Sequence, residues 1–190
     1  MFSRDPVPMA VPNPVIQTLL LAADEAFDRK SWHGPNLKGS IRGLNADRAA
    51  WRPSPGRHNI HEIVIHCAYW KYVARRRLLG EKRETFSRDG SDWFPVMSPN
   101  AAEWKRDVAL LVEMHRALRS AIALYSPRAV HRAVPGSELR AISLINGATA
   151  HDLYHAGQIQ LLKRLGARSA TTALRRAHSA ARLSAPAGRR

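Results

Sequence analysis

The sequence predicts an all-α protein, a four-helix bundle with long interhelical loops and a basic C-terminal tail. Apolar residues recur at alternating spacings of three and four along four long stretches, and none shows the alternation of a strand. At 190 residues and 45% hydrophobic content, the chain can bury one sizeable core. We expect one bundle domain over residues 13–166, between a Pro-rich segment over 1–12 and an Arg/Ala-rich tail over 167–190.

Local signals mark the ends of the first two helices. Asn13-Pro14 combines a cap residue with proline at the first helical position, and predicts a helix that runs to about Lys30. Asn59 followed by Glu62 has the spacing of a capping box. A second helix is therefore expected from just after Asn59 to Leu79, where a glycine follows.

The other two helices have clear starts or stops. Ser98-Pro99 repeats the cap-plus-proline signal and predicts the start of the third helix, which should end before Ser126-Pro127. The fourth helix should begin within residues 137–143 and end at Gly166, since glycine commonly terminates helices. Beyond it, the tail is expected to form at most a short fifth helix.

The fourth predicted helix carries two histidines, one turn apart, in an otherwise apolar stripe. A buried imidazole without a partner costs about 1 to 3 kcal/mol, so His151 and His155 need a reason to be there. A shared metal ion is one reason, and separate hydrogen bonds to backbone carbonyls are the alternative. The stripe consists of Ala141, Leu144, Ala148, His151, His155, Gln158, Leu162 and Leu165.

A metal site used for chemistry needs about three protein ligands, and His66 is the best third candidate. It lies at the edge of the apolar face of the second predicted helix. Glu62 lies four residues earlier on the same face, where it either orients His66, acts as a base, or only caps the helix.

The remaining histidines lack such spacing. The segment from His61 to His66 has one residue too many for an H-E-x-x-H zinc helix, so a zincin-type protease is not supported. We interpret His58 and His61 as loop or surface residues. No role is assigned to His115, His131 and His178.

Three strings resemble the DinB/YfiT-like superfamily: Trp-His-Gly-Pro-Asn-Leu over residues 32–37, Gly-Arg-His-Asn-Ile running into His66 over 56–66, and His-Asp-Leu-Tyr-His-Ala-Gly-Gln-Ile over 151–159. The resemblance covers residues 13–166. It implies a four-helix bundle whose metal is held by His66, His151 and His155, the residues also reached from spacing.

The resemblance also implies a function. Characterised relatives include metal-dependent transferases that use low-molecular-weight thiols, a thiol-dependent isomerase and hydrolases. We therefore expect a metal-dependent enzyme that activates water or a small thiol for transfer or hydrolysis on a small-molecule substrate, as a homodimer. Zinc or nickel is expected, and iron or copper also suits three imidazoles. The alternative is a noncatalytic stress- or damage-associated protein whose metal is structural.

Two connections, residues 31–58 and 80–98, are long for a helix bundle and carry aromatic residues. Either they wall a pocket over the metal, with His33 as a second acid or base candidate, or they only pin the loops to the bundle. The residues considered for the pocket are Trp32, Tyr69, Trp93 and Gln158.

The chain is strongly basic, with 30 lysines and arginines against 15 acidic residues and a net charge of +15. The segment after Gly166 supplies six arginines and no acidic residue. Such a surface attracts polyanions, so weak nonspecific nucleic-acid contact through the tail is the second hypothesis, although arginine-rich composition alone is an equal explanation.

Compartment follows from cysteine usage and hydropathy. Cys67 is the only cysteine, so no intrachain disulfide forms and a reducing, cytoplasmic location is expected. The N-terminus lacks a signal-peptide pattern, and no apolar run approaches the roughly 20 residues that span a bilayer, so no membrane association is expected.

Overall fold

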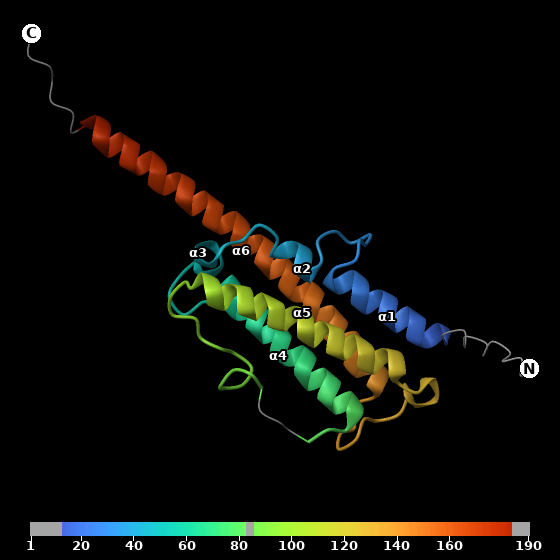
Figure 1. Cartoon of the computed structure of the whole chain (residues 1–190). Coiled ribbons are helices and arrows are strands. Elements are labelled where there is room, and N and C mark those ends of the chain that lie inside the picture. The colour runs from blue at the N-terminus through green and yellow to red at the C-terminus, as the bar shows by residue number, and fades with distance from the viewer. Residues whose placement is uncertain (1–12, 83–85, 184–190) are drawn as a thin grey trace, which may run out of the picture.

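The computed structural model describes residues 13–82 and 86–183, and within them the protein is all-α with long loops between helices, as predicted (Figure 1). Four helices are long: α1 (Pro14–Phe27), α4 (Ile60–Leu79), α5 (Ala101–Leu124) and α6 (Ala141–Leu183). The described chain has no strand, and no helix in it is both long and apolar enough to cross a membrane. Three short helices complete the list: α2 (Leu37–Ser40), α3 (Ala46–Ala50) and the 3₁₀ helix η1 (Pro127–Ala129).

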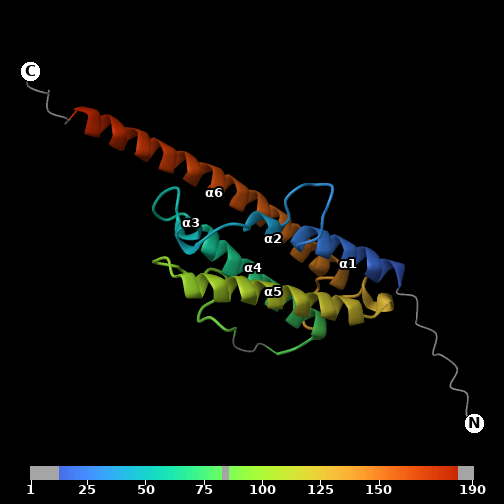
Figure 2. The same ribbon diagram turned by 45° about the horizontal axis from the view of Figure 1, so that its top comes forward.

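The four long helices close into a bundle in which each packs against two others. α4 lies between α5 and α6, and α1 lies between the same two helices on the opposite side. α4 and α1 are therefore diagonal, as Figures 1 and 2 show from two directions. This order brings the α4 histidine next to the α6 pair, because α4 and α6 share an interface.

The capping signals of α1 and α4 are confirmed. Asn13 Oδ1 accepts a hydrogen bond from the amide of Val15, with proline in the first turn. Asn59 and Glu62 form a reciprocal capping box, and Gly80 ends α4 in the left-handed conformation with φ 65°. α1 ends at Phe27, one turn earlier than predicted.

The start of α5 differs from the prediction by two residues. The cap is Asn100 rather than Ser98, because the Asn100 side chain accepts from the amides of Ala102 and Glu103. An amide oxygen that satisfies two free helical N–H groups is the stronger cap. The predicted stop is confirmed, since α5 ends at Leu124 before Ser126-Pro127.

The predicted end of α6 at Gly166 is wrong. The helix continues through Gly166 to Leu183, so the first part of the tail extends the same helix instead of forming a separate fifth one (Figure 1). Glycine inside a helix costs about 1 kcal/mol relative to alanine. Its reason here is a close approach, because a Cβ on Gly166 would lie 3.2 Å from the Trp51 ring. Residues 184–190 of the tail, and the Pro-rich segment 1–12, lie outside the described residues.

The connection between α1 and α4 contains two short helices that the sequence reasoning missed. Asn36 caps α2 by accepting from the Gly39 amide, and Asn45 caps α3 by accepting from the Arg48 amide. Asparagine is a preferred N-cap residue, so both positions carried a signal in the sequence. α2 packs against α6 and α3 against α4, so the connection covers the bundle instead of hanging free.

A buried polar layer separates two apolar clusters of the core. Each long helix contributes to it: Asp24 from α1, Lys71 from α4, His115 from α5 and Asp152 from α6, all at most 7% exposed. Lys71 and Asp152 form an ion pair between α4 and α6. The buried face of α6 differs in part from the predicted stripe, since Leu165 of that stripe is exposed. The buried positions of α6 are Ala141, Ile145, Asp152, His155, Ala156 and Ile159.

Candidate metal centre

Three imidazoles from two helices converge beside the polar layer. His151 Nε2 lies 3.1 Å from His66 Nε2 and 3.0 Å from His155 Nε2. His66 comes from α4, and the other two are one turn apart on α6, whose shared interface brings them together. The ligand atoms of all three lie within 4.8 Å of one another. The spacing argument therefore predicted a cluster that the fold forms.

Hydrogen bonds at the far side of two rings define the tautomers. His66 Nδ1–H donates to the carbonyl oxygen of Asp92 at 2.8 Å. His155 Nδ1–H donates to Gln158 Oε1 at 2.7 Å, and the Gln158 amide in turn donates to the Tyr154 hydroxyl. Because each neutral imidazole carries one proton, both Nε2 atoms present lone pairs to the centre of the cluster.

The rings are neutral at neutral pH. Burial lowers the pKa of His151 to about 3, with the neighbouring charges of His155 and His66 adding to the effect. Burial and the charge of His66 lower the pKa of His155 to about 4, against the Gln158 hydrogen bond. Burial also lowers the pKa of His66, with Asp92 opposing it. The cluster is thus a set of lone-pair donors and not of cations.

Three lone pairs cannot satisfy one another. His151 Nε2 is in contact with both other Nε2 atoms, and its single proton can be directed at only one of them. The other contact then has no proton directed along it, and with the His151 proton on Nδ1 both contacts set lone pair against lone pair. A divalent cation removes this conflict, and nitrogens about 2.0 to 2.1 Å from a tetrahedral ion are roughly 3.3 Å apart, close to the separations found here. The donor set therefore fits a metal.

Asp92, which the sequence reasoning missed, supports the cluster from the loop between α4 and α5. It is the one non-glycine residue with positive φ, at 65°, among the described residues. Its carbonyl accepts from His66, and its carboxylate accepts from Trp70 Nε1 at 2.8 Å. A residue in this strained conformation persists where its surroundings require it. No motif in the sequence marks the position.

Trp93 forms one wall of the cluster. Its ring stacks on His66 at 3.9 Å between centroids and, on its other face, on His58 at 3.6 Å. This contact agrees with the interpretation of Trp93 as a residue beside the site. His58, interpreted as a loop or surface residue, is half-exposed, and its ring stacks on Trp93. Trp70 borders the rings of His66 and His151 edge-on.

Glu62 is held by other partners. Its Oε1 accepts from Arg52 and from the amide of Val96, and its Oε2 accepts from Arg52 and His58. The hydrogen bonds and charge of Arg52 outweigh desolvation and lower the pKa of Glu62 to about 2. Both carboxylate oxygens therefore have partners other than His66. Of the roles considered for Glu62, the structure supports that of helix cap, together with the ion pair to Arg52.

The structure separates three other sequence candidates from the cluster. Trp32 is fully exposed, so it walls no pocket in this conformation. His33 lines a cavity with Leu153, Gly157 and other residues on the face of α6 opposite to the histidine pair. Tyr69 packs against Phe86 and Phe94, and thereby pins the loop after α4 to the bundle.

Two histidines outside the cluster are buried. His61 was interpreted as a surface residue, but it is fully buried and contacts Asp107 at 2.7 Å. His115, given no role, stacks on Phe27 at 3.7 Å. His61 is buried because α5 covers a second side of α4, which the apolar pattern alone does not reveal.

Cys67, His151 and Asp152 form a second group close enough for a metal, but its chemistry is less suitable. Burial raises the pKa of the Cys67 thiol well above its usual value, so the thiol stays protonated. Lys71 already pairs with Asp152. The three histidines are therefore the better donor set.

Comparison with known proteins places the histidine cluster inside a recognised family region. The family model described as the DinB superfamily matches residues 31–159, which include all three histidines. Searches of curated proteins and of solved structures gave no significant match.

Proposed function

This chain belongs to the DinB superfamily, and from that premise we propose that it is a metal-dependent enzyme in which His66, His151 and His155 hold one divalent ion. One observation carries the proposal: the Nε2 atoms of His66 and His155 both lie within hydrogen-bonding distance of His151 Nε2. We propose transfer or hydrolysis on a small substrate, with water or a low-molecular-weight thiol as nucleophile.

The surrounding residues have definable roles in this proposal. Asp92 and Gln158 keep protons on the outer nitrogens of His66 and His155, so that both Nε2 atoms are free to bind. Trp93 excludes water from one side of His66. A divalent ion held there supplies positive charge that lowers the pKa of a water or thiol ligand toward neutrality. His151, the least buried of the three, marks the side from which a substrate approaches.

Cobalt substitution tests both the ligands and the open position. Protein purified without a chelating tag is stripped, loaded with Co²⁺ and mixed with 2-mercaptoethanol or cysteine. We expect one Co²⁺ per chain, d–d bands of a four- or five-coordinate ion, and a new thiolate charge-transfer band on adding thiol. The His131→Ala variant, altered at an exposed histidine, should behave like the wild type. A Co²⁺ spectrum that does not change with added thiol or with pH would indicate a closed, structural site.

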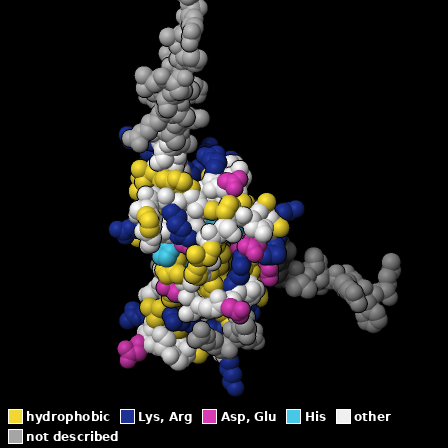
Figure 3. Space-filling view, turned by 90° about the vertical axis from the view of Figure 1, so that its left-hand side faces the viewer, with side chains coloured by type: hydrophobic (Ala, Val, Ile, Leu, Met, Phe, Trp, Pro, Cys, Tyr) yellow, Lys and Arg dark blue, Asp and Glu magenta, His cyan; other side chains and the backbone are white. Residues whose placement is uncertain are grey.

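A second candidate function is contact with nucleic acid. The observation that favours it is the extension of α6 beyond the bundle, in a segment rich in arginine (Figure 1). Lysine and arginine side chains are also dispersed over the end of the bundle seen in Figure 3, so the positive charge is not confined to the tail. This arrangement favours weak binding to phosphates without sequence preference.

A further inference from the structure

A pocket of about 370 Å³ lies between the middle of α6 and α3, together with the residues on either side of α3. It lies about 10 Å or more along α6 from His155, at 1.5 Å of rise per residue, and none of the three histidines lines it. Its volume is in the range of small-molecule sites. The lining residues are Leu44, Asp47, Arg48, Trp51, Leu162, Lys163, Gly166 and Ala167.

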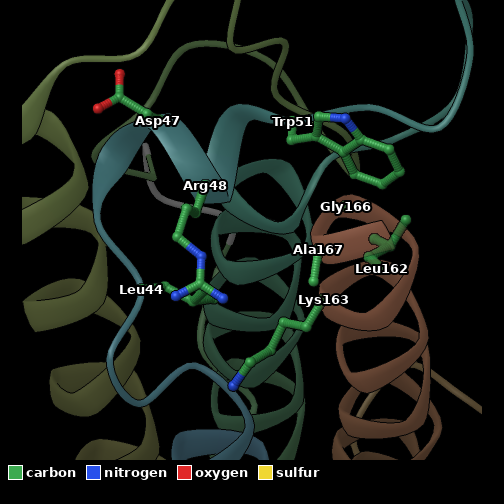
Figure 4. Close-up of a pocket in the computed structure, with 8 residues that line it drawn as sticks. All are labelled: Leu44, Asp47, Arg48, Trp51, Leu162, Lys163, Gly166 and Ala167. Atoms are coloured by element: carbon green, nitrogen blue, oxygen red, sulfur yellow. The ribbon is translucent and has the colours of Figure 1, made fainter. Parts of the chain in front are cut away.

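One wall of the pocket is an aromatic ring seated on a helix. Figure 4 shows the indole of Trp51 lying against α6 at Gly166 and Ala167. Glycine suits this position, because a Cβ at residue 166 would lie 3.2 Å from two ring atoms, closer than an ordinary van der Waals contact. Leu44 and Leu162 add apolar surface. The pocket therefore offers a mostly apolar space bounded by a flat ring.

Two cations face this apolar space from different elements. In Figure 4 the Arg48 side chain runs down from α3 and the Lys163 side chain runs across from α6 to end below it, while the carboxylate of Asp47 points away. Lys163 donates to the carbonyl oxygens of Ser40 at 2.8 Å and Arg42 at 3.5 Å. The Arg48 guanidinium has no hydrogen-bond or ion-pair partner among residues 13–82 and 86–183.

The like charges of these two side chains repel each other, although water partly screens the repulsion because Arg48 is exposed. Both groups line this pocket, and burial together with the charge of Arg48 lowers the pKa of Lys163. An anionic group on a ligand would offset this repulsion and accept from the free guanidinium, which forms bidentate pairs with carboxylates and phosphates.

We propose that this pocket is a binding site for a small amphipathic anion, whose carboxylate or phosphate pairs with Arg48 and Lys163 and whose apolar body lies between Trp51, Leu44 and Leu162. The site is separate from the histidine cluster and does not depend on metal chemistry there. Binding is expected with the His151→Ala variant as well as with the wild type.

The test uses two isosteric probes, 1-naphthaleneacetate and its neutral amide, 1-naphthaleneacetamide. Binding is followed in ¹H–¹⁵N spectra through the indole N–H of Trp51, assigned by its loss in Trp51→Phe. We expect saturable shifts with the acetate and affinity at least about tenfold lower for the amide, since a hydrogen bond to a charged group contributes about that factor. Equal affinity for both probes would show an apolar cleft without anion recognition, and would overturn the proposal.

Variants locate the site. Arg48→Gln should weaken 1-naphthaleneacetate binding about tenfold, whereas Arg164→Gln, an exposed arginine of α6 that lines a different cavity, should leave it unchanged. Ala167→Leu fills the pocket from an exposed helical position, so it should abolish the shifts while the helical circular dichroism is kept. Undiminished binding by a folded Ala167→Leu protein would place the probe elsewhere and overturn the proposal.

Discussion

The imidazole of His66 and the backbone of Asp92 are joined by a 2.8 Å hydrogen bond that spans 26 residues of sequence. Asp92 holds φ at 65° to direct its carbonyl at Nδ1, while its carboxylate accepts from Trp70. One loop residue thus sets the tautomer of a helix residue. In the proposed site, the availability of His66 Nε2 depends on a conformation that few side chains tolerate.

Substitution of Asp92 should separate its backbone role from its side-chain role. Asp92→Gly keeps the left-handed conformation and the carbonyl acceptor, so zinc affinity should fall less than about tenfold. Asp92→Val strains that conformation and misdirects the carbonyl, so affinity should fall by about 10- to 100-fold. Competition with a chromogenic zinc chelator measures both. Equal losses in the two variants would mean that the carboxylate, and not the carbonyl, supports His66.

Removing an inward histidine should remove the metal without unfolding the bundle. His151→Ala and His155→Ala should each abolish stoichiometric zinc binding, while the helical circular dichroism is retained because four packed helices remain. Metal content by plasma mass spectrometry and far-ultraviolet spectra give the two results, with His131→Ala as control. Collapse of helicity in both variants would instead make the metal a folding element.

Removing one partner of the Lys71–Asp152 ion pair should destabilise the fold, whereas replacing both partners should not. Both side chains are at most 3% exposed, so Lys71→Met leaves a buried carboxylate without its cation and should cost about 3 to 5 kcal/mol. The double variant Lys71→Met/Asp152→Leu should recover most of that loss. Urea unfolding of the metal-free proteins measures this cycle. A double variant as unstable as the single one would argue that the pair itself contributes strongly.

The metal-free protein should lose stability as the pH falls below about 6.5. Burial, with the charge of Lys71 second, lowers the pKa of His115 from 6.5 to about 3, whereas nearby Asp24 opposes the shift and Arg119 adds to it. The unfolded chain therefore takes up a proton below pH 6.5 that the folded chain refuses, and the free energy of unfolding falls toward acid.

His115→Phe isolates this contribution in the window from pH 6 to about 5.5, above the ordinary pKa of a glutamate. Phenylalanine keeps the stacking on Phe27 but does not titrate. The slope of unfolding free energy with pH should decrease by about 1.4 kcal/mol per pH unit, the equivalent of one proton. Urea titrations at several pH values give the slope. An unchanged slope would mean that His115 protonates in the folded state.

Truncation after Ser169 tests the nucleic-acid hypothesis. It removes five arginines and keeps Gly166 and Ala167, which contact Trp51 and line its pocket. If the tail binds nucleic acid, the salt dependence of DNA affinity should lose several units of slope, near 0.9 for each phosphate contact removed. Zinc binding should not change. Fluorescence anisotropy at several salt concentrations measures the slope, and an undiminished slope would assign DNA contact to the bundle surface.

The sequence by itself determined the features that depend on local chemistry. Caps such as Asn13 and the Asn59–Glu62 box satisfy the first amides of a helix within a few residues, and apolar periodicity describes one helix at a time. The spacing of His151 and His155 on one helix face belongs to this class. His66 joined them by the need for a third ligand, an inference that the shared interface of α4 and α6 satisfies.

Only the tertiary structure decided what depends on contacts distant in sequence. Glycine is a common helix stop, yet α6 continues through Gly166, where the absence of a Cβ leaves room for the Trp51 ring. His61 has the pattern of a surface residue, yet α5 buries it against Asp107, 46 residues away. Asp92 carries no motif, and its hydrogen bond exists only because the loop folds back onto α4. A residue's local pattern describes its own helix, whereas burial and hydrogen-bond partners depend on which element packs against it.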